Sequence, residues 1–190
     1  MNYSILKLSK FISKGATRIC FEHPEDKSLC VKVVSRFKDE YILQKELNAY
    51  NQIKYVLKEY LVEYKDKLVD TNFGKGVVCE VLRDDNNEYS KTLSFYKEAL
   101  DDEVINQLWH FAYKLIEYDI FFYDFNLNNF IIQIKQGKKK LYYTDIKSFN
   151  HYKPYVYLRL ERFIPFIARH IMIRRLKRFF CNIGIDSLKS

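Results

Sequence analysis

The chain has 190 residues, a length that accommodates one compact domain or two small lobes and excludes two domains with independent cores. Hydrophobic residues make up 48% of the sequence and charged residues 29%, with only five Gly and three Pro, so disordered and collagen-like structures are excluded. Aromatic residues reach 17%, which predicts a core with extensive ring packing.

The net charge of +8 is concentrated at the C-terminal end. Residues 153–190 contain nine basic and two acidic residues, a net charge of +7, whereas the first 152 residues carry only +1. Such a segment is typical of contact with phosphate groups on nucleic acid, lipid headgroups or an anionic substrate. Two interpretations stay open: a packed C-terminal helix with solvated arginines, and peripheral attachment to an anionic membrane.

The cysteine pattern and the absence of a leader indicate the compartment. The four cysteines form no C-x-x-C pair, which argues against a zinc site and against a dense disulfide framework. The N-terminus lacks the apolar run of a signal peptide, and the longest apolar region, 163–173, is too short to span a bilayer. We therefore expect a cytoplasmic protein, located at the inner face of the membrane if the basic segment attaches there.

The first half predicts antiparallel strands and one long helix. Strand patterns appear over residues 3–12, 18–21, 29–34 and 74–82. Between the third and fourth strands, apolar residues recur at three- and four-residue steps from residue 38 to about residue 64, which predicts an amphipathic helix. A polar linker, 83–89, follows the last strand.

The second half is mainly helical. Helical patterns cover residues 94–100, 101–120 and the region around 155–180, and an Asn-rich loop occupies 121–129. Strands at 130–134 and 141–144, joined by Gln136-Gly137-Lys138, predict a hairpin. The predicted fold class is α+β with two lobes: a sheet and one long helix in 1–82, and helices with a small hairpin in 83–190.

Five polar residues stand where their neighbours predict a core: Lys32, Glu46, Asp124, Asn129 and Asp145. Each alone is commonly a strand-edge lysine, a solvated carboxylate or a chance loop residue. Their order, however, is the one that phosphoryl transfer requires. A strand Lys contacts phosphates, a helix Glu holds that Lys, a loop Asp accepts the acceptor hydroxyl's proton, and the Asn and the last Asp hold Mg²⁺.

Three segments resemble protein-kinase motifs. Residues 122–129 resemble the H-R-D-x-x-x-x-N catalytic loop, residues 30–33 the V-A-I-K strand, and residues 145–147 the D-F-G motif. The resemblance implies a minimal protein-kinase-like fold with ATP and Mg²⁺ as cofactors. It assigns the phosphates to the turn at Gly15, Ala16 and Thr17 and to Lys32 and Asn129, and the adenine to the backbone between Glu80 and Leu82.

The departures from these motifs leave several functions open. Phe122-Tyr123 replaces His-Arg, Ile146-Lys147 replaces Phe-Gly, and the phosphate loop has one glycine instead of three. These differences argue against an ordinary protein kinase. The first alternative is a phosphotransferase acting on a hydroxyl of a sugar, an envelope glycolipid or a protein, and the second is a pseudokinase that regulates a partner. The third, a nucleic-acid-binding module, rests on the basic segment alone, so we expect no specific nucleic-acid partner.

Residues 14–26, 30–34 and 45–50 resemble the small bacterial YrbL family of the PhoP regulatory network. The resemblance runs over most of the chain and implies a bacterial cytoplasmic kinase-like protein. Because the catalytic-loop Asp is present at position 124, this sequence favours an active form.

Overall fold

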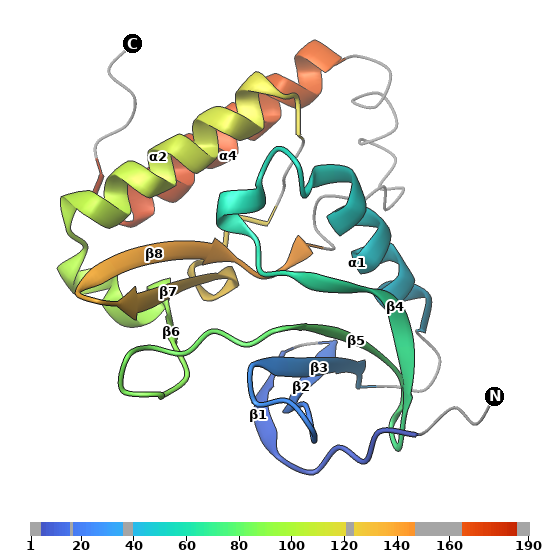
Figure 1. Ribbon diagram of the computed structural model, residues 1–190. Helices are drawn as coiled ribbons and strands as arrows, with labels where there is room; N and C mark the ends of the chain where they lie inside the picture. Colours follow the sequence, from blue (N-terminus) through green and yellow to red (C-terminus); the bar gives the residue numbers. More distant parts are fainter. Residues whose placement is uncertain (1–4, 16, 36–39, 121–123, 147–164, 186–190) are drawn as a thin grey trace.

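The computed structural model describes residues 5–15, 17–35, 40–120, 124–146 and 165–185. It has a five-stranded and a three-stranded sheet, each with antiparallel neighbours, together with helices that pack on them (Figure 1). The predicted α+β fold class is confirmed, and the arrangement is compatible with two lobes.

The larger sheet lies in the first half of the chain. Its strands are β1 (Phe11–Lys14), β2 (Arg18–Glu22), β3 (Leu29–Val34), β4 (Tyr64–Thr71) and β5 (Gly74–Glu80), in the spatial order β1-β2-β3-β5-β4. β3 has the bounds that its β-branched run predicts. The strand expected over 3–12 is confirmed only at its end, because β1 begins at Phe11. Residues 5–10 run alongside the sheet with one bridge from Leu6 to Thr71, and residues 3 and 4 lie outside the described residues.

The helix expected from residue 38 to about 64 is shorter. Helix α1 spans Glu40–Ile53 and is followed by the 3₁₀ helix η1 (Lys58–Tyr60). The helical spacing continues through Leu57, Leu61 and Tyr64, and all three side chains are buried. They lie, however, in a turn and at the start of a strand, not in a helix. Tyr64 begins β4 and pairs with Cys79 on β5, so this part of the chain is a strand although its apolar spacing predicts a helix.

The second half contains the smaller sheet. Its strands are β6 (Lys91–Thr92), β7 (Phe130–Lys135) and β8 (Lys138–Tyr143), in that order. The predicted hairpin is confirmed: Gln136 and Gly137 both have positive φ, 52° and 73°, as a two-residue turn between β7 and β8 requires. The segment expected to be helical at 94–100 is the 3₁₀ helix η2 (Leu93–Ala99), and η3 (Leu127–Asn129) precedes β7.

Two helices lie side by side against this sheet (Figure 1). α2 spans Asp102–Glu117, and the Asp101 side chain caps it by accepting a hydrogen bond from the Val104 amide at 3.1 Å. α4 spans Pro165–Asn182, and the Trp109 ring of α2 stacks on the Phe180 ring at 3.7 Å between centroids. The rest of the helical segment expected around 155–180, up to residue 164, lies outside the described residues.

The side chains of α4 divide into two groups. Met172, Leu176, Phe179 and Phe180 are buried, whereas the basic residues are exposed: Arg169, Arg174, Arg175, Lys177 and Arg178. The apolar stripe is therefore used in packing, which agrees with the interpretation of a packed helix with solvated arginines. Among the described residues, the structure has no helix both long and apolar enough to cross a membrane.

The main core is continuous from the larger sheet and α1 to the smaller sheet, α2 and α4. One face of the larger sheet contributes Cys30, Val34, Val77 and Cys79 to it, whereas the opposite face packs under the N-terminal segment through a separate small cluster. A backbone bridge also joins Leu61, before β4, to Tyr143 at the end of β8. The two sheets are thus connected by main chain as well as by side chains.

We predict that Phe180→Ala lowers the free energy of unfolding by about 3–5 kcal/mol, because it removes the ring that stacks on Trp109 and leaves a cavity. Urea denaturation followed by tryptophan fluorescence measures the change. Lys177→Ala, at an exposed position of the same helix, is the control and stays within about 0.5 kcal/mol. Equal losses in both variants would contradict the packing described for α4.

Candidate functional site

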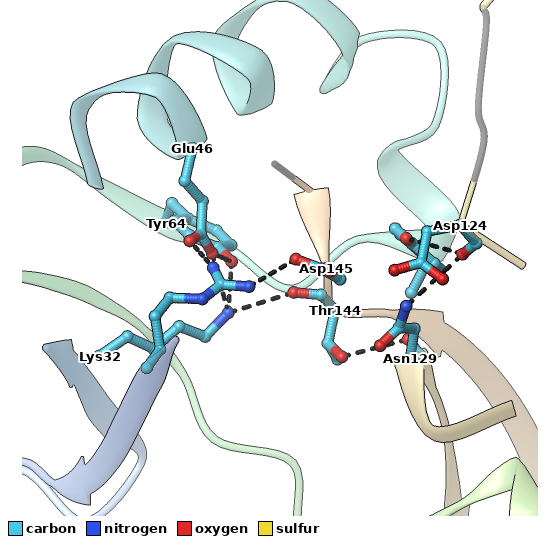
Figure 2. A network of polar contacts seen from close by, with 9 residues as sticks. Lys32, Glu46, Tyr64, Asp124, Asn129, Thr144 and Asp145 are labelled. Carbon is cyan, nitrogen blue, oxygen red and sulfur yellow. Dashed lines mark hydrogen bonds and ion pairs between the residues drawn. The ribbon is translucent and has the colours of Figure 1, made fainter. Parts of the chain in front are cut away.

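A charged network lies where α1 meets the larger sheet (Figure 2). Glu46 stands on the buried face of α1, in the same stripe as Leu43, Leu47 and Tyr50, and is 0% exposed. Its Oε1 atom lies 3.2 Å from the Nζ atom of Lys32 on β3. The structure thus brings together the lysine and the glutamate that the sequence pairs, and holds them away from solvent.

Arg18 on β2 is the second cation of the network. Its guanidinium forms an ion pair with Glu46 and donates a hydrogen bond to Asp145 Oδ1 at 2.5 Å. Asp145 follows β8 and is 8% exposed, so both carboxylates are removed from water. Among the residues that the structure describes, two cations and two anions balance here, which is the condition under which buried charges are tolerated.

Tyr64 completes the contacts of Glu46. Burial raises the pKa of Tyr64 well above its ordinary value, so the phenol keeps its proton and donates to Glu46 Oε1 at 2.7 Å. Lys32 donates to the Tyr64 hydroxyl at 2.5 Å and to the Thr144 carbonyl at 3.3 Å. The last contact ties Lys32 to the residue that precedes Asp145.

The loop that contains Asp124 and Asn129 lies on the other side of Thr144 (Figure 2). The Thr144 amide and hydroxyl both donate to the Asn129 carbonyl, at 2.8 and 3.1 Å. The Asp124 carbonyl accepts hydrogen bonds from the Asn129 side-chain amide at 3.5 Å and from the Tyr143 hydroxyl at 3.4 Å. The Asp124 side chain is exposed, so it is accessible to a substrate.

A cavity of about 520 Å³ opens beside Asp124. Polar and apolar side chains from η2, from residues 124–128 and from the end of α4 line it. Among its lining residues are Lys97, Asn126, Asn128, Asn182, Phe179 and Ile183. Amide groups and one amine beside a carboxylate suit a polar ligand rich in hydroxyl groups.

The other predicted contacts lie around β2 and β5. The Gly15 amide donates to the Arg18 carbonyl at 2.8 Å, and the Thr17 carbonyl accepts from the Ser35 amide, while Ala16 lies outside the described residues. Glu80 ends β5, and the Leu82 carbonyl two residues later accepts a hydrogen bond from the Ser90 amide at 3.0 Å. That carbonyl is therefore already used within the chain.

The donor set determines which cofactor the site suits. Asp145 and Asn129 offer hard oxygen donors, which suit Mg²⁺, and Lys32 offers a cation to phosphate oxygens. The described residues contain no cluster of three or more His, Cys, Asp or Glu side chains arranged to hold a metal. A cation here would thus need oxygens of its ligand as well as those of the protein, and Arg18 would have to release Asp145 Oδ1.

Sequence reasoning did not find Arg18, Tyr64 or Glu22. Arg18 and Glu22 share a face of β2 with Cys20, which is opposite Lys32, so strand alternation was the available signal. Glu22 is buried and receives hydrogen bonds from Lys10 at 3.0 Å and Tyr89 at 2.8 Å, and it forms an ion pair with Arg83. It fixes β2 to the linker between the two sheets.

These features define a two-sheet α+β protein with a charge-balanced network buried between its sheets. The chain belongs to the family described as PhoP regulatory network protein YrbL, whose model matches residues 5–184.

Two relatives carry the printed name "Uncharacterized protein YrbL", one from Escherichia coli strain K12 and one from Shigella flexneri. Each is 30% identical over 111 residues, which cover 56% of this chain and 53% of the relative. The alignment therefore spans about half the length of these relatives.

We predict that Glu46→Gln lowers the free energy of unfolding by about 3–5 kcal/mol, because it leaves the buried cations of Lys32 and Arg18 with one anion. Chemical denaturation at neutral pH measures the loss. Glu59→Gln is the matched control: its carboxylate is half exposed, pairs with Lys114 at 3.0 Å and contributes less than about 1 kcal/mol. A loss at Glu46 no larger than the control would show that the network adds little stability.

A further prediction concerns how the stability of the fold changes at acidic pH. Burial raises the pKa of Glu22, but hydrogen bonds from Lys10 and Tyr89 and the charges of Lys10 and Arg83 outweigh it, so the pKa lies below its ordinary value of 4.5. A carboxylate with a lower pKa in the folded than in the unfolded protein stabilises the fold at pH values above its ordinary pKa. This stabilisation is lost as the pH falls through the folded-state pKa. Glu22→Gln should therefore be destabilised at pH 7, and the difference from wild type should shrink on acidification.

Urea denaturation at a series of pH values from about 7 down to about 3.5 follows this difference. Glu25→Gln, at an exposed position of the next turn, should stay within about 0.5 kcal/mol of wild type at pH 7. If the Glu22 difference stayed constant across the series, the ionised carboxylate would not be what stabilises this part of the sheet.

Proposed function

We propose that the chain is an ATP- and magnesium-dependent phosphotransferase of the protein-kinase-like type, with a hydroxyl acceptor. The observation that carries the proposal is the buried Lys32–Glu46 ion pair at 3.2 Å, joined through Arg18 to Asp145. In kinases, a strand lysine held by a helix glutamate contacts the phosphates, and an aspartate after a hairpin holds the metal. The order of elements is consistent with this, since α1 lies between β3 and β4 of an antiparallel sheet.

At the nucleotide end, Lys32 would donate to phosphate oxygens while Glu46 keeps its amine in place. The turn before β2 would cover the phosphates, and Asn129 and Asp145 would supply oxygens to Mg²⁺. Magnesium, when bound, neutralises charge on the phosphate oxygens and aligns them for transfer. For this to occur, the Arg18 guanidinium must move from Asp145, and the incoming phosphates are anions to which it can transfer its hydrogen bond.

At the acceptor end, Asp124 would take the proton of the attacking hydroxyl. Its exposed carboxylate borders the 520 Å³ cavity, whose lining of Lys97 and three asparagines suits a hydroxylated, neutral or anionic acceptor. An envelope sugar or glycolipid fits this chemistry. Asn129, in the same loop as Asp124, accepts hydrogen bonds from Thr144, whose own carbonyl accepts one from Lys32, so hydrogen bonds connect the two ends of the proposed site.

The basic side chains of α4 suggest where such an acceptor would be met. The helix buries its apolar side chains in the core and exposes its basic ones, which are Arg169, Arg174, Arg175, Lys177 and Arg178. Contact with anionic lipid at the inner face of the membrane would therefore be electrostatic and sensitive to salt.

One observation favours a second candidate, a pseudokinase that binds a nucleotide and regulates a partner. Arg18 already pairs with Asp145, the carboxylate on which the metal would depend. If this contact persists with nucleotide bound, Arg18 acts as a permanent cation and no magnesium is required. The two candidates therefore differ in their requirement for metal.

We predict that ATP raises the melting temperature of the wild-type protein in the presence of Mg²⁺. At an ATP concentration 100 times the Kd, binding should add about 2.7 kcal/mol to the free energy of unfolding. Lys32→Ala and Asp145→Ala should abolish the rise. Lys75→Ala is the matched control, because its lysine lies on the same sheet but pairs with Asp70 at the surface. Far-UV circular dichroism shows whether each variant is folded.

Three outcomes separate the candidates. A magnesium-dependent rise lost in both variants supports the phosphotransferase, and Asp124→Asn should then bind ATP normally while losing at least about 100-fold of transfer to a sugar acceptor. A rise that does not depend on magnesium supports the pseudokinase. No rise with any nucleotide would overturn both.

A further inference from the structure

Three cysteines gather on the face of the larger sheet that carries Lys32. They lie on adjacent strands: Cys20 on β2, Cys30 on β3 and Cys79 on β5. The register sets Cys20 opposite Lys32 and Cys30 opposite Cys79, and the side chains of all three pack into the main core. The proposed function assigns no role to these thiols.

The closest pair is Cys30 and Cys79. Their Sγ atoms are 3.4 Å apart in a buried hydrogen bond, and the two side chains are 4% and 1% exposed. Residues directly opposite one another in an antiparallel pair have Cα atoms about 4.5–5.5 Å apart, which lies inside the range of about 4.4–6.8 Å that a disulfide spans. Closure to a bond of about 2.05 Å therefore needs movement of the sulfur atoms and little movement of the strands.

The electrostatics of the pair make the two thiols unequal. The hydrogen bond from Cys30 lowers the pKa of Cys79 to about 7, and the charges of Lys32 and Arg18 act in the same direction against burial. Hydrogen bonding with Cys20 and Cys79, together with burial, raises the pKa of Cys30 well above its ordinary value. The surroundings of the pair thus favour a thiolate on Cys79 over one on Cys30.

We propose that Cys30 and Cys79 form a peroxide-reactive dithiol that closes to a cross-strand disulfide beside Lys32. The proposal rests on the distance, the register and the burial of the two thiols. It does not depend on nucleotide binding or phosphoryl transfer.

The chemistry balances with hydrogen peroxide as the oxidant. The Cys79 thiolate attacks one peroxide oxygen, the O–O bond breaks, and the departing hydroxide takes up a proton to become water, which leaves a sulfenic acid on Cys79. The Cys30 sulfur, losing its proton, then attacks the Cys79 sulfur and displaces hydroxide, which becomes a second water. The two sulfur atoms lose two electrons, and the peroxide gains them.

Burial selects the reagent. Hydrogen peroxide is only slightly larger than water, so a brief opening of the core would admit it, whereas a bulky thiol reagent should meet the exposed Cys181 first. The product would connect β3 to β5 two residues from Lys32, so oxidation would fix the spacing of the strands beside the buried network.

The experiment treats the full chain with hydrogen peroxide, quenches it with an alkylating reagent, and maps the cysteines by trypsin digestion and mass spectrometry. Each cysteine falls in a different tryptic peptide, with Cys30 in residues 28–32 and Cys79 in residues 76–83. We expect these two peptides to be linked, with a loss of about 2 Da from the intact chain that dithiothreitol reverses. Cys181→Ala should retain the link, and Cys30→Ala and Cys79→Ala should each abolish it.

Alkylation of the denatured chain provides the second measurement. All four thiols of the untreated protein should react, whereas after peroxide Cys30 and Cys79 should stay unmodified until dithiothreitol is added. Two results would overturn the proposal: Cys30 and Cys79 that stay free after peroxide has oxidised Cys181, or a disulfide that joins Cys20 to Cys30. Because both readouts use the protein without nucleotide, they stand whether or not ATP binds.

Discussion

The buried carboxylate of Glu46 is the constraint on which the arrangement of the protein depends. A carboxylate removed from water is destabilising by several kcal/mol unless cations and hydrogen-bond donors surround it. Here the donors come from three strands: Arg18 on β2, Lys32 on β3 and Tyr64 on β4. Glu46 therefore fixes the rotation of α1 about its axis as well as its position against the sheet.

The same requirement extends to the smaller sheet. Glu46 carries one negative charge and cannot balance both Lys32 and Arg18. Asp145, which follows β8, supplies the second negative charge. Lys32 likewise reaches the Thr144 carbonyl. The charge balance thus joins residues separated by more than a hundred positions, and it connects the two halves of the chain at one point.

Much of this could be predicted from the sequence, and the limits have physical causes. β3 and the β7–β8 hairpin followed from local signals: a β-branched run for the strand, and two strand patterns joined by a glycine-containing turn for the hairpin. The end of α1 did not follow, because the apolar spacing through Tyr64 continues whether a helix or a strand buries it. β4 was missed because Lys65, Asp66 and Lys67 are exposed on an edge strand, where charged residues are common. Lys32 and Glu46 were found by their order along the chain, whereas Arg18 meets Asp145 across 127 positions and no local pattern reports such a contact.

The backbone bridge between Leu61 and Tyr143 limits how the two sheets can move relative to one another. Both residues are buried, so breaking this bridge would leave polar main-chain groups without water. A motion that keeps the bridge intact is a rotation about it, with the β4 and β8 edge acting as a hinge axis. The greatest displacement would then fall at the opposite edge of the larger sheet, where β1 and β2 lie, and it would break the ion pair between Arg18 and Asp145. The buried charges therefore oppose the one motion that the main chain permits.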